Sequence, residues 1–219
     1  MTKTQVEKHF DKIAVTYDKG KNKYSFYYNN LKKLLYFLIP RDKKVLEIGC
    51  GTGDLLAGLR PKYGYGFDIS SKMIEIAKQK YQKSKKLRFS TKWPDTWFDY
   101  VFMSDVIEHL ENPQSEFKRI VKLMNSKTVF IITMANPIWE SLLIFWEKMG
   151  WKMKEGKHRR IDYKEIKTKV ERSGLKIIKH DYKLLIPVQI PFVTTLANKY
   201  LERPFKKFAF IEYIVAVKA

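Results

Sequence analysis

The feature that most limits the possible folds of this chain is the run VLEIGCGTG at residues 45–53. Residues 44–48 form a short, mainly apolar stretch, and glycines follow at alternate positions 49, 51 and 53. Glycine permits backbone conformations that a Cβ hinders, and it lets a ligand approach the main chain closely. Residues 53–59 then have helical character. The run therefore predicts a buried strand, a tight turn and a helix, as in a doubly wound α/β sheet.

Strand-like and helix-like stretches alternate after this run. We expect strands at residues 44–48, 63–67, 87–90, 98–103, 129–134, 175–180 and 210–217. We expect helices within residues 4–38 and at 53–59, 70–81, 114–124, 138–149 and 163–173. Residues 129–134 are continuously apolar, as a parallel strand covered on both faces should be. This alternation favours an α/β fold with a largely parallel sheet.

A second motif helps to interpret the glycine turn. A dinucleotide-binding fingerprint would need a third glycine at position 54, where this chain has Asp54. The stretch GFDIS at residues 66–70 instead places Asp68 at the end of the next predicted strand. A carboxylate there can accept hydrogen bonds from two ribose hydroxyls. The alternative for Asp68 is a structural role as a helix cap.

Taken together, VLEIGCGTG, FDIS, FDYVFMSDVIEHLENP at residues 98–113 and FIITMANP at 130–137 resemble the class I methyltransferases that use S-adenosylmethionine (SAM). The resemblance is strongest to the small-molecule group (methyltransferase type 11) that includes ubiquinone and menaquinone biosynthesis enzymes. It covers residues 6–136 well and the C-terminal part loosely. It implies a Rossmann-like, seven-stranded, mainly parallel sheet with an antiparallel last strand, helices on both faces and a helical cap. It also implies methyl transfer from SAM, with S-adenosylhomocysteine (SAH) as product.

The resemblance assigns a set of cofactor-binding residues, which are Tyr17, Glu47, Gly49, Cys50, Gly51, Asp68, Ile69, Met73, Ser104 and Asp105. The glycine loop would lie under the methionyl and ribose parts, and Glu47 would organise that loop or reach the SAM ammonium. Asp68 would hold the ribose, Ile69 and Met73 the adenine, and Tyr17 would close over the site. Ser104 and Asp105 would border the methionine part and the acceptor. Relatives often have an acidic residue after the third strand, whereas residues 89–92 here are FSTK, so Ser90, Thr91 or a carbonyl would replace it.

The candidate catalytic residues are Asp105 and His109. They are four residues apart, so a helix beginning there would place both on one face. His109 is then either a general base that takes a proton from the acceptor or a packed histidine that orders the loop. A base is needed only for a protonated acceptor, because the sulfonium of SAM is already a good leaving group. We expect no metal, since the four histidines are widely scattered.

We expect one methyltransferase domain over residues 1–219, with an N-terminal helical lid at 1–40 and cap insertions at 138–160 and 182–207. The uncharged apolar stretch 184–198 is followed by Lys199 and Tyr200, a combination typical of an interfacial anchor. It favours a small-molecule, lipid-like or glycan acceptor, with peripheral membrane contact. The single cysteine and the polar N-terminus predict a cytoplasmic protein.

Two alternatives remain open at this point. A formal net charge of +20 suits an RNA methyltransferase with a basic surface. However, 35 lysines against 8 arginines suggest a lysine-rich composition more than a nucleic-acid reader, which relies on the arginine fork. The second alternative is a non-catalytic SAM-binding partner protein, against which the intact glycine loop and Asp68 argue.

Overall fold

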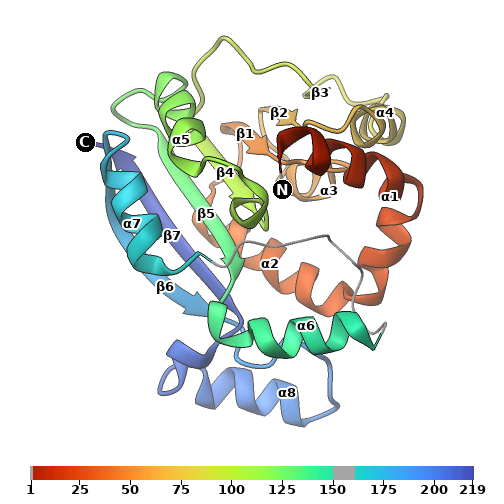
Figure 1. Cartoon of the computed structure of the whole chain (residues 1–219), viewed down its shortest axis with the longest axis vertical. Helices are drawn as coiled ribbons and strands as arrows, with labels where there is room; N and C mark the ends of the chain where they lie inside the picture. Colours follow the sequence, from red (N-terminus) through yellow and green to blue (C-terminus); the bar gives the residue numbers. More distant parts are fainter. Residues whose placement is uncertain (1, 150–160) are drawn as a thin grey trace.

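A computed structural model describes residues 2–149 and 161–219 of the chain. Its centre is a seven-stranded sheet with the strand order β3-β2-β1-β4-β5-β7-β6 (Figure 1). The strands are β1 (Lys44–Ile48), β2 (Tyr63–Phe67), β3 (Leu87–Ser90), β4 (Tyr100–Ser104), β5 (Val129–Ala135), β6 (Leu175–Lys183) and β7 (Ile211–Lys218). β7 is antiparallel to both of its neighbours, and the pairs among β1 to β5 are parallel. The predicted Rossmann-like fold with an antiparallel last strand is therefore confirmed.

Helices cover both faces of the sheet, as predicted. They are α1 (Lys3–Lys23), α2 (Ser25–Leu38), α3 (Asp54–Gly58), α4 (Ser71–Lys80), α5 (Pro113–Lys122), α6 (Glu140–Lys148), α7 (Tyr163–Glu171) and α8 (Val193–Leu196). One core cluster contains Phe117 of α5 and Ile166 of α7, and the other contains Leu35 of α2 and Ile74 of α4. Each side of the sheet is thus sealed by the apolar stripe of its own helices.

The register of the central strands aligns their carboxyl ends. Ile48 of β1 pairs with Phe67 of β2 on one side and with Met103 of β4 on the other. The segments that follow these three strands therefore emerge at one edge of the sheet. This is the edge at which open α/β sheets bind their ligands.

The apolar stretch after β6 contains only short pieces of regular secondary structure. It contains α8, a π-helical turn at Ala197–Leu201 and a 3₁₀ turn at Lys206–Phe208. Polar side chains hold its backbone: Asn198 exchanges two hydrogen bonds with the main chain of Ile186, and Glu202 accepts one from the N–H of Leu184. Prolines limit helix length here, so side chains replace the missing backbone partners.

Candidate active site

The glycine loop after β1 has the left-handed backbone that its sequence predicts. Gly49, Gly51 and Gly53 have φ angles of +71°, +50° and +84°. The N–H groups of Gly49 and Cys50 both donate to the carbonyl of Phe67, at 2.8 and 3.0 Å, which bends the loop toward β2. A Cβ on Gly49 would lie 2.3 Å from Cγ2 of Val106, so this loop packs directly against the segment after β4.

Asp68 connects the glycine loop to the start of α4. One carboxylate oxygen accepts the N–H of Gly51 at 2.8 Å, and the other accepts the N–H of Ser70 at 2.9 Å. The residue is buried, and this burial raises the pKa of its carboxyl, although the backbone N–H donors oppose the shift. Asp68 therefore organises both loops at once, in addition to the ribose contact that remains a prediction.

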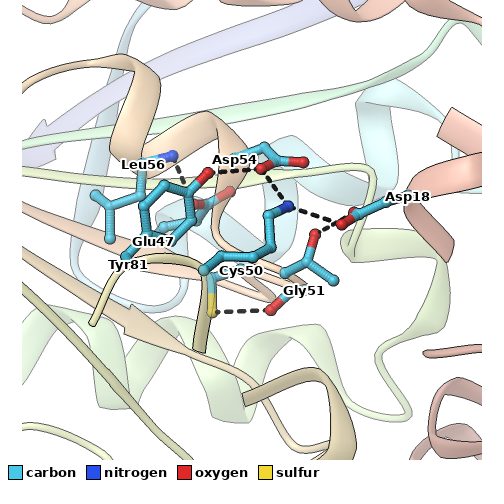
Figure 2. Close-up of polar contacts among 9 residues, drawn as sticks. Asp18, Glu47, Cys50, Gly51, Asp54, Leu56 and Tyr81 are labelled. Atoms are coloured by element: carbon cyan, nitrogen blue, oxygen red, sulfur yellow. Dashed lines mark hydrogen bonds and ion pairs between the residues drawn. The ribbon is translucent and has the colours of Figure 1, made fainter. Parts of the chain in front are cut away.

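Glu47 lies under the same loop and is also buried. Its carboxylate accepts the N–H of Leu56 in the first turn of α3 at 3.0 Å (Figure 2). Burial raises the pKa of Glu47 from 4.5 to about 8, and the nearby Lys21 ammonium acts in the opposite direction. The contact with α3 agrees with the loop-organising role predicted for this residue, and the contact with the SAM ammonium stays a prediction.

Glu47 should make the stability of the ligand-free protein depend on pH. The unfolded carboxyl ionises near 4.5, whereas the folded one keeps its proton until about 8. The folded state binds more protons in this window, so its free energy of unfolding decreases as the pH rises. We expect the melting temperature of Glu47→Gln to decrease less across this range than that of the parent protein. Equal slopes in a pH series of thermal melts would contradict this prediction.

The N-terminal helix α1 closes over these loops through three polar side chains. Asp11 accepts a hydrogen bond from the Ser70 hydroxyl at 2.5 Å. Asp18 accepts one from the Thr52 hydroxyl at 2.5 Å and forms an ion pair with Lys80 at 2.7 Å (Figure 2). The ring of Tyr17 lies over Gly51, where an added Cβ would be 3.2 Å from Cε1. The structure thus has Tyr17 above the loop, as a lid residue would be.

Lys21 was not among the predicted site residues. Its ammonium lies over the rings of Tyr28 and Tyr17, 4.6 and 5.4 Å from their centroids. Burial lowers the pKa of Lys21, while the negative charges of Asp54 and Glu47 raise it. The sequence pattern that could have identified it is its spacing: Lys21 comes four residues after Tyr17 in the same helix, so the two side chains share a face.

Asp105 and His109 are not on one helix face, so that expectation is wrong. Asp105 directly follows β4 in the left-handed region, with φ +54°, and only a single 3₁₀ turn at Ile107–His109 comes next. The Tyr27 hydroxyl donates to Oδ2 of Asp105 at 2.7 Å. His109 packs edge-to-face against Phe10 of α1, with ring centroids 5.3 Å apart. The left-handed backbone at Asp105 and the 3₁₀ turn thus stand where the spacing favoured a regular helix.

This packing gives a prediction for His109. We expect His109→Gln to reduce the methyl-transfer rate by less than about tenfold, compared with the 10²–10⁴-fold that a lost general base typically costs. A larger decrease in kcat, at unchanged melting temperature, would instead assign the base to His109. Steady-state rates on the acceptor decide between the two roles.

The predicted adenine side consists of small polar groups and buried apolar ones. The carbonyl of Ser90 accepts the N–H of Asp68 at 3.3 Å, and the Ser90 hydroxyl accepts the N–H of Lys92 at 3.0 Å. Ile69 is half-buried, whereas Met73 is fully buried, so Met73 reaches a ligand only if a neighbour moves. Cys50 is buried behind the loop, and burial raises the pKa of its thiol. The contacts of these residues with SAM stay predictions.

A cavity of about 410 Å³ opens next to Asp105 at the same edge of the sheet. Its walls come from α2, from the segments after β4 and β5, from α6 and from the segment after β6. The lining residues are Tyr24, Tyr27, Tyr28, Asp105, Ile107, Glu108, Met134, Ala135, Asn136, Pro137, Glu140, Leu143, Ile144, Trp146, Glu147, Ile161, Pro187, Val188 and Phe210. Parts of both predicted cap insertions, 138–160 and 182–207, therefore contact one cavity. Residues 150–160 of the first insertion lie outside the described residues.

The described ranges, 2–149 and 161–219, offer neither a metal cluster nor a helix that could span a membrane. In these ranges, no group of three or more His, Cys, Asp or Glu side chains could hold a metal ion. Within the same ranges, none of the helices combines the length and the apolar character needed to cross a membrane.

Comparison with known proteins shows to which family the sequence is similar. A family model described as a methyltransferase domain matches residues 22–180. Phosphoethanolamine N-methyltransferase 2 of Caenorhabditis elegans is 31% identical over 101 residues, which are 41% of this chain and 23% of that protein. Demethylmenaquinone methyltransferase of Chlorobaculum tepidum is 29% identical over 137 residues, 55% of this chain and 57% of that protein. The matched stretches thus span less than two thirds of these curated relatives.

A solved structure shares the fold over nearly the whole chain. It is a SAM-dependent methyltransferase from Thermotoga maritima, described as a possible histamine N-methyltransferase. It superposes with a TM-score of 0.73 at 18% identity and covers 98% of this chain and 100% of the other. The fold found here therefore occurs in a known protein of about the same length.

Proposed function

Because this chain belongs to the family of methyltransferase domains, we propose that it transfers the methyl group of SAM to a small-molecule acceptor. The observation that carries this proposal is the short segment after β4. Val106 packs against Gly49 of the glycine loop, and the preceding residue, Asp105, lines the cavity. Only Asp105 and Val106 would thus lie between a cofactor on the loop and an acceptor in the cavity.

The residues of the loop fit SAM. Three glycines with positive φ present their backbone at the sheet edge, and a side chain on Gly51 would occupy the space under Tyr17. A buried carboxylate, Asp68, lies at the end of the adjacent strand, where a ribose can be held through its hydroxyls. The close approach of the loop backbone suits the methionyl and ribose parts of the ligand.

The protein's contribution to this reaction is positioning. SAM, when bound, supplies a methyl group on a sulfonium leaving group. Tyr17 and the rest of α1 cover the loop, and α6 with Pro187 and Val188 encloses the cavity, so both exclude water. Holding two reactants in line can contribute about 7–11 kcal/mol to lowering a barrier. No base is required when the acceptor atom already carries a free electron pair.

The proposed acceptor class is a small molecule with an apolar part. The cavity of about 410 Å³ is of the size of small-molecule sites, and most of its walls are apolar. The names of the relatives support this class, since they include methyltransferases of phosphoethanolamine and of demethylmenaquinone. The names of these relatives give no comparable support to the RNA alternative.

The test combines binding with transfer. Calorimetry is expected to detect SAH binding, and label from methyl-labelled SAM is expected in the lipid or small-metabolite fraction of a cell extract. Absence of SAH binding would overturn the proposal. Label confined to the RNA fraction would favour the RNA alternative, and SAH binding without transfer to any fraction would favour a non-catalytic partner protein.

We further propose that the cap contacts an anionic membrane surface. We call its exposed apolar side chains the apolar cap surface; they are Leu142, Phe145, Met149, Val188, Ile190, Phe192, Leu196, Phe205 and Phe208. Figure 1 draws α6 and α8 at the same end of the molecule. Lys199, Lys206 and Lys207 are exposed and close in sequence to Leu196, Phe205 and Phe208, so the segment offers apolar insertion together with attraction to anionic lipids.

Vesicle flotation tests this contact. We expect the protein to float with phosphatidylcholine vesicles containing phosphatidylglycerol, and Phe192→Glu/Leu196→Glu to reduce the floated fraction strongly. These side chains are 85% and 56% exposed, so the change affects the surface and not the core. Val15→Glu/Phe37→Glu is the control, because it places the same charges at residues that are 85% and 78% exposed on α1 and α2. Equal flotation of the two variants would contradict the proposal.

A further inference from the structure

Helix α1 is attached to the rest of the protein more by polar side chains than by apolar burial. Two of the 21 residues of this helix, which is described throughout, are buried. Asp11 accepts the Ser70 hydroxyl and Asp18 accepts the Thr52 hydroxyl, both at 2.5 Å, at the two loops of the cofactor site. Segments that bury few apolar side chains open locally at low cost in free energy. The closed position of α1 therefore depends on polar contacts at the cofactor site.

Lys21, near the end of α1, extends toward the same site. Its ammonium lies over the rings of Tyr17 and Tyr28, 5.4 and 4.6 Å from their centroids. The ring of Tyr17 in turn lies over Gly51, where an added Cβ would be 3.2 Å from Cε1. Ring faces attract an ammonium group but do not neutralise its charge. A positive charge on the lid helix is thus held beside the ring that covers the glycine loop.

The carboxylates around Lys21 are engaged by other groups. Burial lowers the pKa of the Lys21 ammonium, and the charges of Asp54, Glu47 and Asp18 raise it. However, Asp18 and Asp54 form their ion pairs with Lys80, at 2.7 and 2.6 Å. Glu47 accepts a backbone N–H of α3. In the described ranges, 2–149 and 161–219, none of these acids forms an ion pair with Lys21, so its ammonium can still bind an anion.

The methionyl part of SAM carries an ammonium and a carboxylate on the same carbon. Glu47 lies under the glycine loop and is the residue predicted to reach that ammonium. Lys21 comes from the lid helix, and Glu47 and Lys21 each affect the pKa of the other, so the two groups are neighbours. A zwitterion between them would meet an opposite charge at each end.

From the position of Lys21 on α1, above a loop that suits the methionyl part, we propose that Lys21 binds the cofactor carboxylate and thereby holds α1 closed. This inference rests on the proposed function and deepens it, because it names the residue that couples the lid to the cofactor. Asp11 and Asp18 bind groups of the protein itself. Lys21 instead adds a charge-assisted bond that exists only when the carboxylate is present.

This coupling would make lid closure selective. An adenosine compound without the carboxylate could still occupy the loop and contact Asp68, but it would leave Lys21 without its anion. Closure of a lid excludes water and completes the arrangement of the reacting groups. Lys21 is therefore a positioning residue, through which the protein closes fully over SAM and less fully over compounds that lack the methionyl carboxylate.

Calorimetric binding of SAH and of decarboxylated SAH, which keeps the adenosine, the sulfur and the amine, tests the inference without turnover. We expect the parent protein to bind SAH at least about tenfold more tightly than the decarboxylated compound. Lys21→Met should weaken SAH about tenfold and leave the decarboxylated compound nearly unchanged, so that the preference disappears. Lys21→Arg should keep most of the preference, since a guanidinium also binds a carboxylate.

Lys23→Met is the matched control. It removes the same charge from the same last turn of α1, at a residue that is exposed. We expect it to keep both affinities and the preference for SAH. An equal loss of SAH affinity in Lys21→Met and Lys23→Met would show a general effect of charge and would overturn the inference.

Amide hydrogen exchange of α1 gives a second readout, which reports lid closure directly. At saturation, SAH is expected to slow exchange in α1 of the parent protein more than decarboxylated SAH does. In Lys21→Met the two ligands should slow it equally. Equal protection of the parent protein by both ligands would overturn the coupling between carboxylate and lid.

The outcomes separate this inference from the proposed function. If the parent protein does not bind SAH, the proposed function fails. If SAH binds and Lys21→Met weakens SAH and decarboxylated SAH by the same factor, Lys21 has a structural role only. The inference is then overturned while the proposed function stands, and the same holds if Lys21→Met binds SAH as tightly as the parent protein does.

Discussion

Gly51→Val is expected to lower the affinity for SAM by more than about a hundredfold, because the new side chain fills the space between the loop and its lid. Gly51 has φ +50°, and an added Cβ already lies 3.2 Å from Tyr17. The two methyl groups of valine extend further in the same direction. Either the Tyr17 ring moves or the ligand is displaced from the loop. Calorimetric titration with SAH measures the resulting loss of affinity.

Gly174→Val provides the matched control. Gly174 has φ +83° at the end of α7, and no heavy atom lies within 4 Å of an added Cβ. Both variants therefore carry the backbone strain of a branched residue at positive φ, of the order of 1–3 kcal/mol. Only Gly51→Val adds the steric block. SAH affinity that decreases equally in the two variants would show that strain, and not occupation of the ligand space, is responsible.

The second large effect is expected for Asp68→Ala, which should weaken SAM binding by about 1–3 kcal/mol, roughly five- to 150-fold. The substitution leaves the N–H groups of Gly51 and Ser70 without their acceptor and removes the predicted ribose contact. Asp68→Asn is the graded control, because its amide oxygen can still accept one of these two bonds. We expect its loss of affinity to be smaller than that of alanine.

Stability must be measured beside affinity, since Asp68 ties two loops together. A thermal melt without ligand reports the structural cost, and the additional shift of the melting temperature with SAH reports binding. If Asp68→Ala lowers the melting temperature but leaves the SAH affinity unchanged, Asp68 acts as a structural cap alone, which is the alternative that the sequence left open.

Local patterns predicted most of the fold. The expected strand at residues 44–48 coincides with β1, and those at 63–67 and 87–90 coincide with β2 and β3. These strands are short apolar runs bounded by glycine, proline or polar residues, so the information lies within a few neighbouring positions. Ser70 caps α4 as its type and position predict, with its hydroxyl accepting the N–H of Met73.

The parts of the site that need an unusual backbone conformation could be predicted from the sequence. The parts formed where segments distant along the chain meet could not. The glycine loop and Asp68 are recognisable because only certain residue types suit a turn with positive φ and a strand end beside it. The contact of Tyr27 with Asp105 joins residues 78 positions apart, and no local pattern contains it. The spacing of Asp105 and His109 suited a helix. Spacing alone, however, does not show that the backbone at Asp105, directly after β4, is left-handed.

For this protein, then, the sequence by itself determined the succession of strands and helices along the chain, the glycine loop and the family. Only the tertiary structure decided which side of α6 faces inward. A periodic pattern defines two faces of a helix but not their surroundings, and an apolar stripe is normally assigned to the core. Here α6 lines a cavity with Glu140 and Glu147 beside Leu143, Ile144 and Trp146, while Leu142 and Phe145 are exposed. That choice depends on what lies across the cavity from the helix, in segments far away along the chain.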